Sequence, residues 1–483
     1  ALYNYLFAKQ QGGEFILRIE DTDQTRFVPG AEEYIRSSLE WSGIHPDESP
    51  WKPSCDTAYR QSERKHLYPA FAKQLIESGH AYYAFDTAEE LKSIRERAKK
   101  AGSVNWQYNN ITRGHMRNSL TLPASEVSKL LESGAPYVIR IKLERNEEVR
   151  FHDHIRDWVT VNTSNMDDKV LYKSDGMPTY HLANVVDDHL MGITHVIRGE
   201  EWLPSAPLHV LLYRYLGWEE RMPVFAHLPL LLRPDGNGKL SKRDGDRLGF
   251  PVFPLDWQST DGKETASGYR ERGFYPDAFV NMLAFLGWNP GTEQEIFSME
   301  ELIDSFSLDK VGKAGARFDF DKAKWFNQQY LRKRTAQQLA EEVAPLLAKA
   351  GLDIPERLPE ICELMKERAV FSSDIIDHGA FLFSDNISYD QKAVQKKWKT
   401  DSAAHLAALR DCFSKSAPFT ADILENDFKA LLDELEIGFG QLGPISRIAL
   451  TGSLSGPSIF MICELLGKER SLHRFDNAIE SLG

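Results

Sequence analysis

Residues 227–246 read HLPLLLRPDGNGKLSKRDGD, an apolar run that leads into a short basic segment with flanking glycines. The segment KLSKRDGD at 239–246 carries Lys239, Lys242 and Arg243 within five residues. A buried strand that delivers a mobile cationic loop suits a triphosphate, because compact positive charges stabilise the negative charge that develops on transferring phosphoryl oxygens. A solvated basic turn is the alternative interpretation, and the segment taken alone favours it. The rest of the chain decides between the two.

The chain of 483 residues is too long for one hydrophobic core, so several domains are expected. Its composition, 42% hydrophobic and 27% charged, is that of an ordinary globular protein, and no apolar run is long enough to span a bilayer. The net charge of −13 argues against indiscriminate coating of nucleic acid. It still allows an RNA partner that is bound by local basic faces.

The four cysteines are scattered along the chain, at Cys55, Cys362, Cys412 and Cys463. None of them belongs to a CxxC pair. This pattern predicts reduced thiols in a cytosol-like compartment and no cysteine zinc site.

The first residues predict an amphipathic helix, with Leu2, Tyr5 and Leu6 on its apolar face, that ends at Gly12-Gly13. The sequence opens inside this helix, at Ala1. We therefore expect that the natural N-terminus, with a first strand and any targeting peptide, precedes the residues given.

Residues 15–19 predict a strand that runs into the acidic residues Glu20, Asp21 and Asp23. Open α/β sheets place ligand-binding groups at the carboxyl ends of their strands. Turn and helix-cap chemistry is the alternative, and it suits Asp23 better than Glu20. Helical stretches over roughly 30–43 and 60–79 continue a βα alternation to about residue 81.

The pattern changes over residues 82–177, where Thr87 and Glu90 predict a capping box at the start of a charged helix that ends at Gly102. A short strand is predicted at 138–141. The stretch therefore indicates an insertion between two halves of a nucleotide-binding fold. Its basic run at 95–100 predicts a solvated helix face, with contact to an RNA backbone as the alternative.

Residues 194–198 predict a second strand, which ends on Arg198. An arginine at that place suits a bidentate grip on a carboxylate. A salt bridge to a neighbouring acid such as Glu200 is the alternative. His189 and His195 show no metal-ligand spacing, so a structural role is expected for both.

The last part of the chain predicts helices, which are aromatic-rich over 250–325 and nearly continuous from about 326. A capping box at Thr335 and Gln338 starts one of them. Apolar stripes at helical spacing predict core faces, and they comprise Leu339, Val343, Leu346 and Leu347, then Phe428, Leu431, Leu432 and Leu435. Four lysines surround Trp398, at Lys392, Lys396, Lys397 and Lys399, and they form either an RNA-facing patch or a solvated face.

Several stretches occur in a fixed order along the chain: FILRIEDTDQTR at 15–26, KSDGMPTYHLAN at 173–184, THVIRGEEW at 194–202, KLSKR at 239–243, ALTGSLSGP at 449–457 and LLGKER at 465–470. Together they resemble the bacterial-type glutamyl-tRNA synthetases, a family of class I aminoacyl-tRNA synthetases, over essentially the whole chain. KLSKR corresponds to the second signature loop of that class.

The resemblance implies an α/β Rossmann-type catalytic domain with an α+β connective insertion and an all-α C-terminal anticodon-binding region. The implied boundaries are 1–81 for the first half of the catalytic domain, 82–177 for the acceptor-binding insertion, 178–246 for the second half with the KLSKR loop, 247–325 for a stem-contact domain, and 326–385 and 386–483 for two helical anticodon-binding subdomains.

The resemblance also implies the reaction. L-Glutamate and ATP form glutamyl-adenylate, and the glutamyl group then passes to the terminal adenosine of tRNA(Glu). The family generally needs bound tRNA for the first step. The attacking group is the carboxylate of the substrate, so no protein nucleophile is required. ATP would bring Mg²⁺, held mostly by phosphates and water.

Individual roles follow from matching positions. Glu20 matches the residue that binds the α-ammonium group, and Arg198 matches the arginine that reads the side-chain carboxylate. Tyr180, Asn184 and Trp202 match other pocket positions. The catalytic signature is matched by Lys239, Lys242 and Arg243, with Lys239, Ser241 and Lys242 at the ATP phosphates and Lys242 as the first candidate for the α- and β-phosphates. Arg368 and Arg447 match anticodon-reading arginines, which implies discrimination against tRNA(Gln).

Two departures from the family pattern stand out. The first signature of the class, a His-x-Gly-His-like segment that cradles ATP, belongs just before Ala1 and is absent; we expect it in the preceding residues. Some relatives carry a Cys/His zinc knuckle in the insertion, but the matching stretch 82–117 has no cysteine, so zinc is not expected.

Three other interpretations compete with this one. A tRNA-modifying glutamyl transferase on the same fold lacks the anticodon region, and glutaminyl-tRNA synthetase has a β-barrel there, so the predicted helices after 326 argue against both. A non-catalytic tRNA-binding protein is disfavoured by the lysine segment, Glu20 and Arg198. We expect a monomer without membrane association in a bacterial cytoplasm, with an organelle as the alternative.

Overall fold

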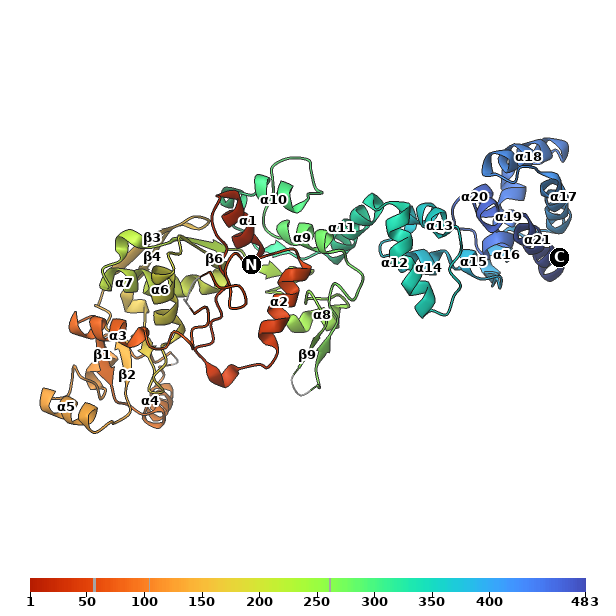
Figure 1. Ribbon diagram of the computed structural model, residues 1–483. Helices are drawn as coiled ribbons and strands as arrows, with labels where there is room; N and C mark the ends of the chain where they lie inside the picture. The colour runs from red at the N-terminus through yellow and green to blue at the C-terminus, as the bar shows by residue number, and fades with distance from the viewer. Residues whose placement is uncertain (55–57, 104, 260–261) are drawn as a thin grey trace. The chain divides into compact units, whose positions relative to one another are not determined.

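The computed structural model describes residues 1–54, 58–103, 105–259 and 262–483 (Figure 1). The chain forms two compact units, Ala1–Gly268 with Val280–Asp319, and Tyr269–Phe279 with Phe320–Gly483. The finer division into six parts stays a prediction. Cys362, Cys412 and Cys463 are free thiols, as predicted, and Cys55 lies outside the described residues.

The first unit combines helices with short strands (Figure 1). Its helices are α1 (Leu2–Gln10), α2 (Ala31–Trp41), α3 (Tyr68–Glu77), α4 (Ala88–Lys100), α5 (Ala124–Glu132), α6 (Tyr180–Leu190), α7 (Ala206–Tyr215), α8 (Lys242–Leu248) and α10 (Met299–Ser305). Its strands are β1 (Ala81–Ala84), β2 (Val138–Ile141), β3 (Glu148–Asp153), β4 (Asp157–Asn162), β5 (Val170–Tyr172), β6 (His195–Gly199), β7 (Val224–Leu228), β8 (Leu231–Leu232), β9 (Trp257–Gln258), β10 (Thr265–Ala266) and β11 (Ala316–Arg317). Helix α9 (Pro276–Ala284) runs from the second unit into the first.

A mixed four-stranded sheet in the order β4-β3-β7-β6 lies at the centre of this unit. Strands β6 and β7 pair in parallel, with Ile197 opposite Ala226. Strand β3 forms an antiparallel hairpin with β4 and meets β7 in parallel where Asp153 faces Phe225. The β3–β4 hairpin belongs to the stretch predicted as an insertion, so part of that stretch builds the same sheet as the predicted catalytic half.

The remainder of the predicted insertion contributes a second sheet to this unit. Strands β1, β2 and β5 make a three-stranded sheet whose pairs are antiparallel. Helix α4 begins with the predicted capping box of Thr87 and Glu90 and buries none of its residues. Its basic run is therefore exposed, and contact of this run with an RNA backbone stays a prediction.

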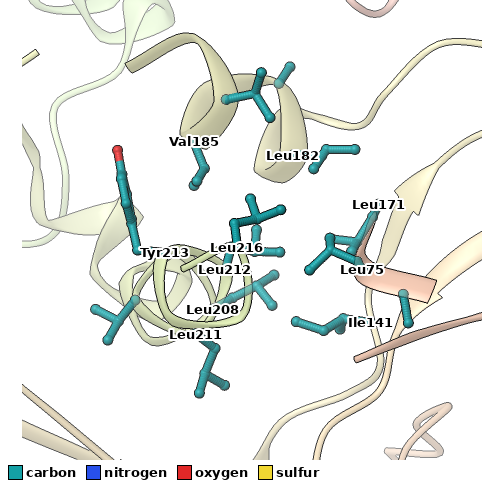
Figure 2. Packing of buried hydrophobic residues seen from close by; sticks show 14 of the residues in the cluster. Leu75, Ile141, Leu171, Leu182, Val185, Leu208, Leu211, Leu212, Tyr213 and Leu216 are labelled. Atoms are coloured by element: carbon teal, nitrogen blue, oxygen red, sulfur yellow. The ribbon is translucent and has the colours of Figure 1, made fainter. Parts of the chain in front are cut away.

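The largest core cluster described for the first unit surrounds helix α7, which is buried on every side from Ala206 to Tyr213. Figure 2 shows Leu212 and Leu216 below Leu182 and Val185 of α6, with Leu75, Ile141 and Leu171 to their right, while Leu211 points to the opposite side of helix α7. Each such side chain contributes roughly 1.5–3 kcal/mol when fully buried. This packing fixes helix α6, whose first residues reach the candidate site.

Two elements predicted for the first 80 residues differ from the structure. Residues 15–19 are extended but form no strand, because their neighbours lie in irregular segments and supply only isolated bridges, from Ile16 to Glu48 and from Ile19 to Arg60. The helix predicted over 60–79 begins only at Tyr68, after a series of turns. Proline at the second helical position favours a helix start there, since it has no N–H to donate.

The strand predicted over 227–232 is also interrupted. Strand β7 ends at Leu228, because Pro229 cannot donate to a ladder, and the next N–H, of Leu230, donates to Glu200 instead. The expectation of a mobile loop over 239–246 is wrong for its second half. Helix α8 begins at Lys242, because the Ser241 N–H and hydroxyl both donate to Asp244 and cap the helix.

The second unit contains helices as its regular elements, as predicted for an all-α region (Figure 1). These are α11 (Phe320–Lys333), α12 (Ala336–Lys349), α13 (Leu358–Met365), α14 (Asp374–His378), α15 (Ala380–Phe383), α16 (Gln391–Lys397), α17 (Ser402–Lys415), α18 (Ala421–Glu434), α19 (Phe439–Thr451), α20 (Ile459–Leu466) and α21 (Lys468–Leu482). The capping box at Thr335 is present. The apolar stripes face the core, with Leu339, Val343, Leu347, Phe428 and Leu431 buried.

In the described part of the chain, no helix combines the length and the apolar character that crossing a membrane requires.

Candidate active site

The first unit contains a cavity of about 780 Å³ between helix α1, the extended residues 14–20, helix α6 and strand β6. The pocket residues implied by the resemblance all line it, namely Glu20, Tyr180, Asn184, Arg198 and Trp202. They come from three separate stretches of the sequence, around residues 20, 180–184 and 198–202, and the tertiary structure brings these stretches together. An acid, an arginine and two aromatic rings in one cavity suit a small zwitterion with a second carboxylate.

Arg198 is held from two sides. Its Nη1 donates to the Tyr180 hydroxyl at 2.7 Å, and its Nε donates to His227 Nε2 at 3.1 Å. Its Nη2 is buried and has no hydrogen-bond partner among the described residues. The alternative salt bridge to Glu200 does not form, since Glu200 pairs with Arg156 at 2.7 Å. The guanidinium group is therefore fixed in place with one N–H edge unused.

Glu20 lies at the end of the extended segment and is held through one oxygen. Its Oε1 accepts hydrogen bonds from Arg18 at 3.0 Å and from Asn184 at 3.1 Å. Its side chain stays 38% exposed, so the carboxylate keeps acceptor capacity for a cation. Asn184 is thus a positioning group for this acid.

A buried ionic network behind Glu20 supports the segment, and sequence reasoning did not identify it. Arg18 pairs with Asp188 at 2.9 Å, and Asp187 accepts from Arg64 at 2.7 Å and from Tyr68 at 2.9 Å. Burial raises the pKa of Asp188 to about 6, although Arg18 acts in the opposite direction. The adjacent acids at 187–188, directly after two valines of helix α6, were the only signal for this network in the sequence.

The aromatic wall of the cavity is formed by Tyr180 and Trp202, whose ring centroids lie 4.6 Å apart. Burial raises the pKa of the Tyr180 hydroxyl to about 12, so it stays protonated at neutral pH. Behind it, His181 Nδ1 and His209 Nε2 lie 3.2 Å apart. Burial lowers the pKa of His181 to about 4 and that of His209 well below its ordinary value, so both rings are neutral.

The two histidines expected to be structural make ring contacts. His189 stacks on Trp218, with centroids 3.8 Å apart and planes within 3°. His195 packs edge-on against Phe7 at 4.6 Å, and it also lines the cavity. Burial lowers the pKa of both.

The lysine segment, KLSKRDGD at 239–246, differs from the cavity in that its Lys239 is more exposed than Arg198 is. Lys239 pairs with Glu201 at 2.7 Å, and both side chains are about half exposed. Ser241 and Asp244 form the cap of helix α8, and Asp244 also accepts from Arg247 at 3.0 Å. Lys242 and Arg243 occupy the first turn of this helix, but their side chains lie outside the described residues. Because Glu201 precedes Trp202, the ion pair ties the lysine segment to a chain segment that lines the cavity.

In the second unit, the predicted anticodon arginines meet at one loop. Arg368 donates to the carbonyl of Gly456 at 3.1 Å, and Arg447 donates to the carbonyl of Pro457. Burial lowers the pKa of Arg447, and the positive charge of Arg368 lowers it further. Lys392 and Lys396 are exposed on helix α16, so contact with RNA remains a prediction for that patch.

The described residues contain no group of three or more His, Cys, Asp or Glu side chains arranged to hold a metal ion.

Comparisons with known proteins agree with this architecture. Residues 1–325 match the family model described as tRNA synthetases class I (E and Q), catalytic domain, and residues 338–479 match the model described as anticodon binding domain. A glutamate–tRNA ligase of Porphyromonas gingivalis is 52% identical over 485 residues, which cover 100% of this chain and 95% of that protein. A glutamate–tRNA ligase of Cytophaga hutchinsonii is 50% identical over 489 residues, which cover 100% of this chain and 94% of that protein.

A solved structure gives the same result. The glutamate–tRNA ligase of Elizabethkingia meningosepticum, crystallised in complex with its amino acid, superimposes with a TM-score of 0.95 at 49% identity and covers 100% of this chain and 95% of that one. The chain therefore belongs to the class I glutamate–tRNA ligases.

Proposed function

We propose that this chain attaches L-glutamate to tRNA(Glu) in an ATP-dependent reaction that passes through glutamyl-adenylate. The observation that carries the proposal is the fixed Arg198 with its unused Nη2, in the same cavity as Glu20. A carboxylate pairs with the arginine fork, and the α-ammonium group pairs with the acid. Glutamine is the poorer substrate, because its amide offers a single acceptor to that fork.

The chemistry then depends on position and charge. The α-carboxylate of glutamate attacks the α-phosphorus of ATP and pyrophosphate leaves, so the protein supplies no nucleophile. Lys239, Ser241, Lys242 and Arg243 are our candidates for the phosphate contacts. In the second step, the terminal adenosine of tRNA takes the glutamyl group and AMP leaves.

We propose that Mg²⁺ enters with ATP, because phosphates and water supply most of the ligands that this ion needs. When bound, it neutralises phosphate charge. We also propose that no zinc knuckle is present, because residues 82–117 contain no cysteine.

ATP–pyrophosphate exchange with glutamate, measured on the full-length protein with and without total tRNA, tests the function. We expect exchange only when tRNA is present. Absence of exchange in both cases, with tRNA still bound, would indicate a non-catalytic tRNA-binding protein instead.

We further propose that the chain charges tRNA(Glu) and refuses tRNA(Gln), with Arg368 and Arg447 at the anticodon. The support is that both arginines converge on the loop at 456–457 in the second unit. Charging assays with the two purified tRNAs, run on the wild type and on Arg368→Gln, test this. Equal charging of both tRNAs by the wild type contradicts the proposal.

We also propose a bacterial cytoplasmic protein, since the similar ligases reported above are bacterial proteins, and we take a monomer as the oligomeric state to be tested. Sedimentation of the full-length protein at micromolar concentration checks the oligomeric state, and a dimer would contradict it.

A further inference from the structure

Strand β3 carries an acid at a position where its pattern calls for an apolar residue. Val149 and Phe151 point inward and are buried, and Asp153 continues the same face with 0% exposure. A buried carboxylate requires several hydrogen bonds to be stable. Asp153 Oδ1 accepts from the backbone N–H groups of Ile155 at 3.0 Å, Arg156 at 2.8 Å and His227 at 3.2 Å. These hydrogen bonds therefore fix the Asp153 carboxylate at the end of strand β3.

The second oxygen of Asp153 makes the contact that matters for the site. Asp153 Oδ2 lies 2.6 Å from Nδ1 of His227, which is also fully buried. Burial works to raise the pKa of Asp153, yet the hydrogen bonds from His227 and the backbone lower it below its ordinary value. The carboxylate is thus ionised and acts as an acceptor.

The other ring nitrogen of His227 fixes the tautomer. Nε2 receives the Nε–H of Arg198 at 3.1 Å, and a guanidinium group can only donate. Nε2 must therefore be unprotonated, and the single ring proton must reside on Nδ1, where it is donated to Asp153. The chain Asp153–His227–Arg198 has one consistent direction of donation.

We propose that Asp153 and His227 are positioning residues that set the orientation of Arg198 for the side-chain carboxylate of the substrate. The inference rests on the proposed function, and it adds the residues that make Arg198 selective. With Nε bound to His227 and Nη1 bound to Tyr180, the planar guanidinium group has no free rotation, and its Nη2 is the one nitrogen left without a described partner. A group that is ordered in advance costs less entropy when the ligand binds.

The backbone of His227 is braced as well. Arg156 Nε donates to the His227 carbonyl at 3.1 Å, while Arg156 pairs with Glu200 just beyond strand β6. His227 is therefore held both at its imidazole ring and at its main-chain carbonyl. The strand supplying Asp153 comes from the stretch predicted as an insertion, so that stretch takes part in reading the amino acid.

Asp153→Asn is the sharpest test because it preserves shape. Its amide oxygen can keep the three backbone hydrogen bonds, which turns the NH₂ group toward His227 Nδ1. Nδ1 must then accept a hydrogen bond, so the ring proton moves to Nε2. Two N–H groups then face each other, and the hydrogen bond from Arg198 Nε to His227 is lost. We expect the KM for glutamate to rise roughly tenfold or more, with the KM for ATP unchanged.

Two variants at His227 distinguish loss of the hydrogen-bond acceptor for Arg198 from a change in packing. The amide oxygen of His227→Gln can reach the place of Nε2 and accept from Arg198, whereas His227→Phe fills the volume without an acceptor. We expect His227→Phe to match Asp153→Asn, and His227→Gln to recover most of the glutamate affinity. Val149→Ala, buried on the same face of strand β3 four residues before Asp153, serves as the control. It should lower the melting temperature and leave the KM for glutamate unchanged.

ATP–pyrophosphate exchange in the presence of tRNA gives the KM values for glutamate and ATP, and the ratio of kcat/KM for glutamate over glutamine gives the selectivity. A selective rise in the KM for glutamate with a lower selectivity supports the positioning role. Wild-type constants in Asp153→Asn, or equal rises for glutamate and ATP, overturn it while the function stands. Absence of exchange in the wild type overturns the function and the positioning role together. Should His227→Phe fail to fold, the comparison of Asp153→Asn with His227→Gln decides.

Discussion

The lysine segment and the cavity that contains Arg198 and Glu20 hold charged groups in opposite ways. In the cavity, Arg198 is fixed by Tyr180 and by the buried His227. In the lysine segment, Lys239 is 53% exposed and pairs with an acid that is 43% exposed. Recognition of a small carboxylate needs a fixed geometry, because selectivity depends on which atoms can pair. A polyphosphate needs positive charges that can follow it, and partly solvated lysines retain that freedom.

The largest expected effect comes from removing the fixed group. Arg198→Ala should remove on the order of 2–5 kcal/mol of binding free energy, because a desolvated charge pair is lost, and kcat/KM for glutamate should fall accordingly. Arg198→Lys should restore little of this, since an ammonium group cannot make the same planar contacts. ATP–pyrophosphate exchange with tRNA measures both variants. A near wild-type constant for Arg198→Ala would show that another group reads the carboxylate.

The next effect concerns stability and pH. The unfolded chain protonates His181 near its ordinary pKa of about 6.5, and the folded pocket does so only near pH 4. Unfolding therefore takes up a proton between these values, and the free energy of unfolding falls as the pH is lowered through this window. Between about pH 7.5 and about pH 5 the wild type should lose about 1–2 kcal/mol more than His181→Gln.

Comparing the two proteins is necessary because Asp188 acts with the opposite sign. Its pKa is raised to about 6, so the folded state takes up that proton first and gains stability as the pH falls. The contribution of Asp188 is shared by wild type and variant and cancels in the difference. Melting temperatures at the two pH values provide the measurement, and identical shifts for both proteins would show that His181 is not kept neutral by folding.

A smaller effect is expected at Asp244, and it should change the KM for ATP without changing the KM for glutamate. Asp244→Ala removes the acceptor that joins Ser241 and Arg247 to the start of helix α8. We expect the KM for ATP to rise roughly five- to tenfold, as for the loss of one charged hydrogen bond, with the KM for glutamate unchanged. Steady-state exchange kinetics at varied ATP and varied glutamate measure the two constants. Equal rises in both would mean that the segments act as one unit.

The smallest effect is expected at the exposed ion pair. Glu201→Gln leaves Lys239 without its partner, and the cost in stability should stay below about 1 kcal/mol. Released from the acid, Lys239 can turn toward phosphate, so the KM for ATP should fall by up to about twofold at low salt. At about 0.5 M salt the difference should vanish through screening. A difference that persists at high salt contradicts a solvated pair.

The sequence predicted the architecture well where the patterns were long. The all-α second unit followed from apolar stripes at helical spacing, such as Leu339 with Val343 and Leu347. Capping boxes at Thr87 and Thr335 marked helix starts correctly. Short elements were less predictable, because hydrogen bonds to distant segments decide them. Residues 15–19 look like a strand, yet they meet only irregular neighbours.

For the candidate site, the motifs named Glu20 and Arg198, and the structure places both in one cavity. The catalytic roles of Lys239, Lys242 and Arg243 remain predictions. Asp153 and His227 had no signal in the sequence, because a buried acid on a short strand and a histidine in an apolar run resemble ordinary variation.

The sequence by itself thus determined the family and the helical character of the second unit, and it supplied the candidate residues for glutamate and ATP. Only the tertiary structure decided which nitrogen of Arg198 is free, which proton His227 carries and which acid holds it there. The physical reason is that these properties depend on hydrogen bonds between residues 29 and 74 positions apart. Local propensity and periodicity contain no information about such pairs.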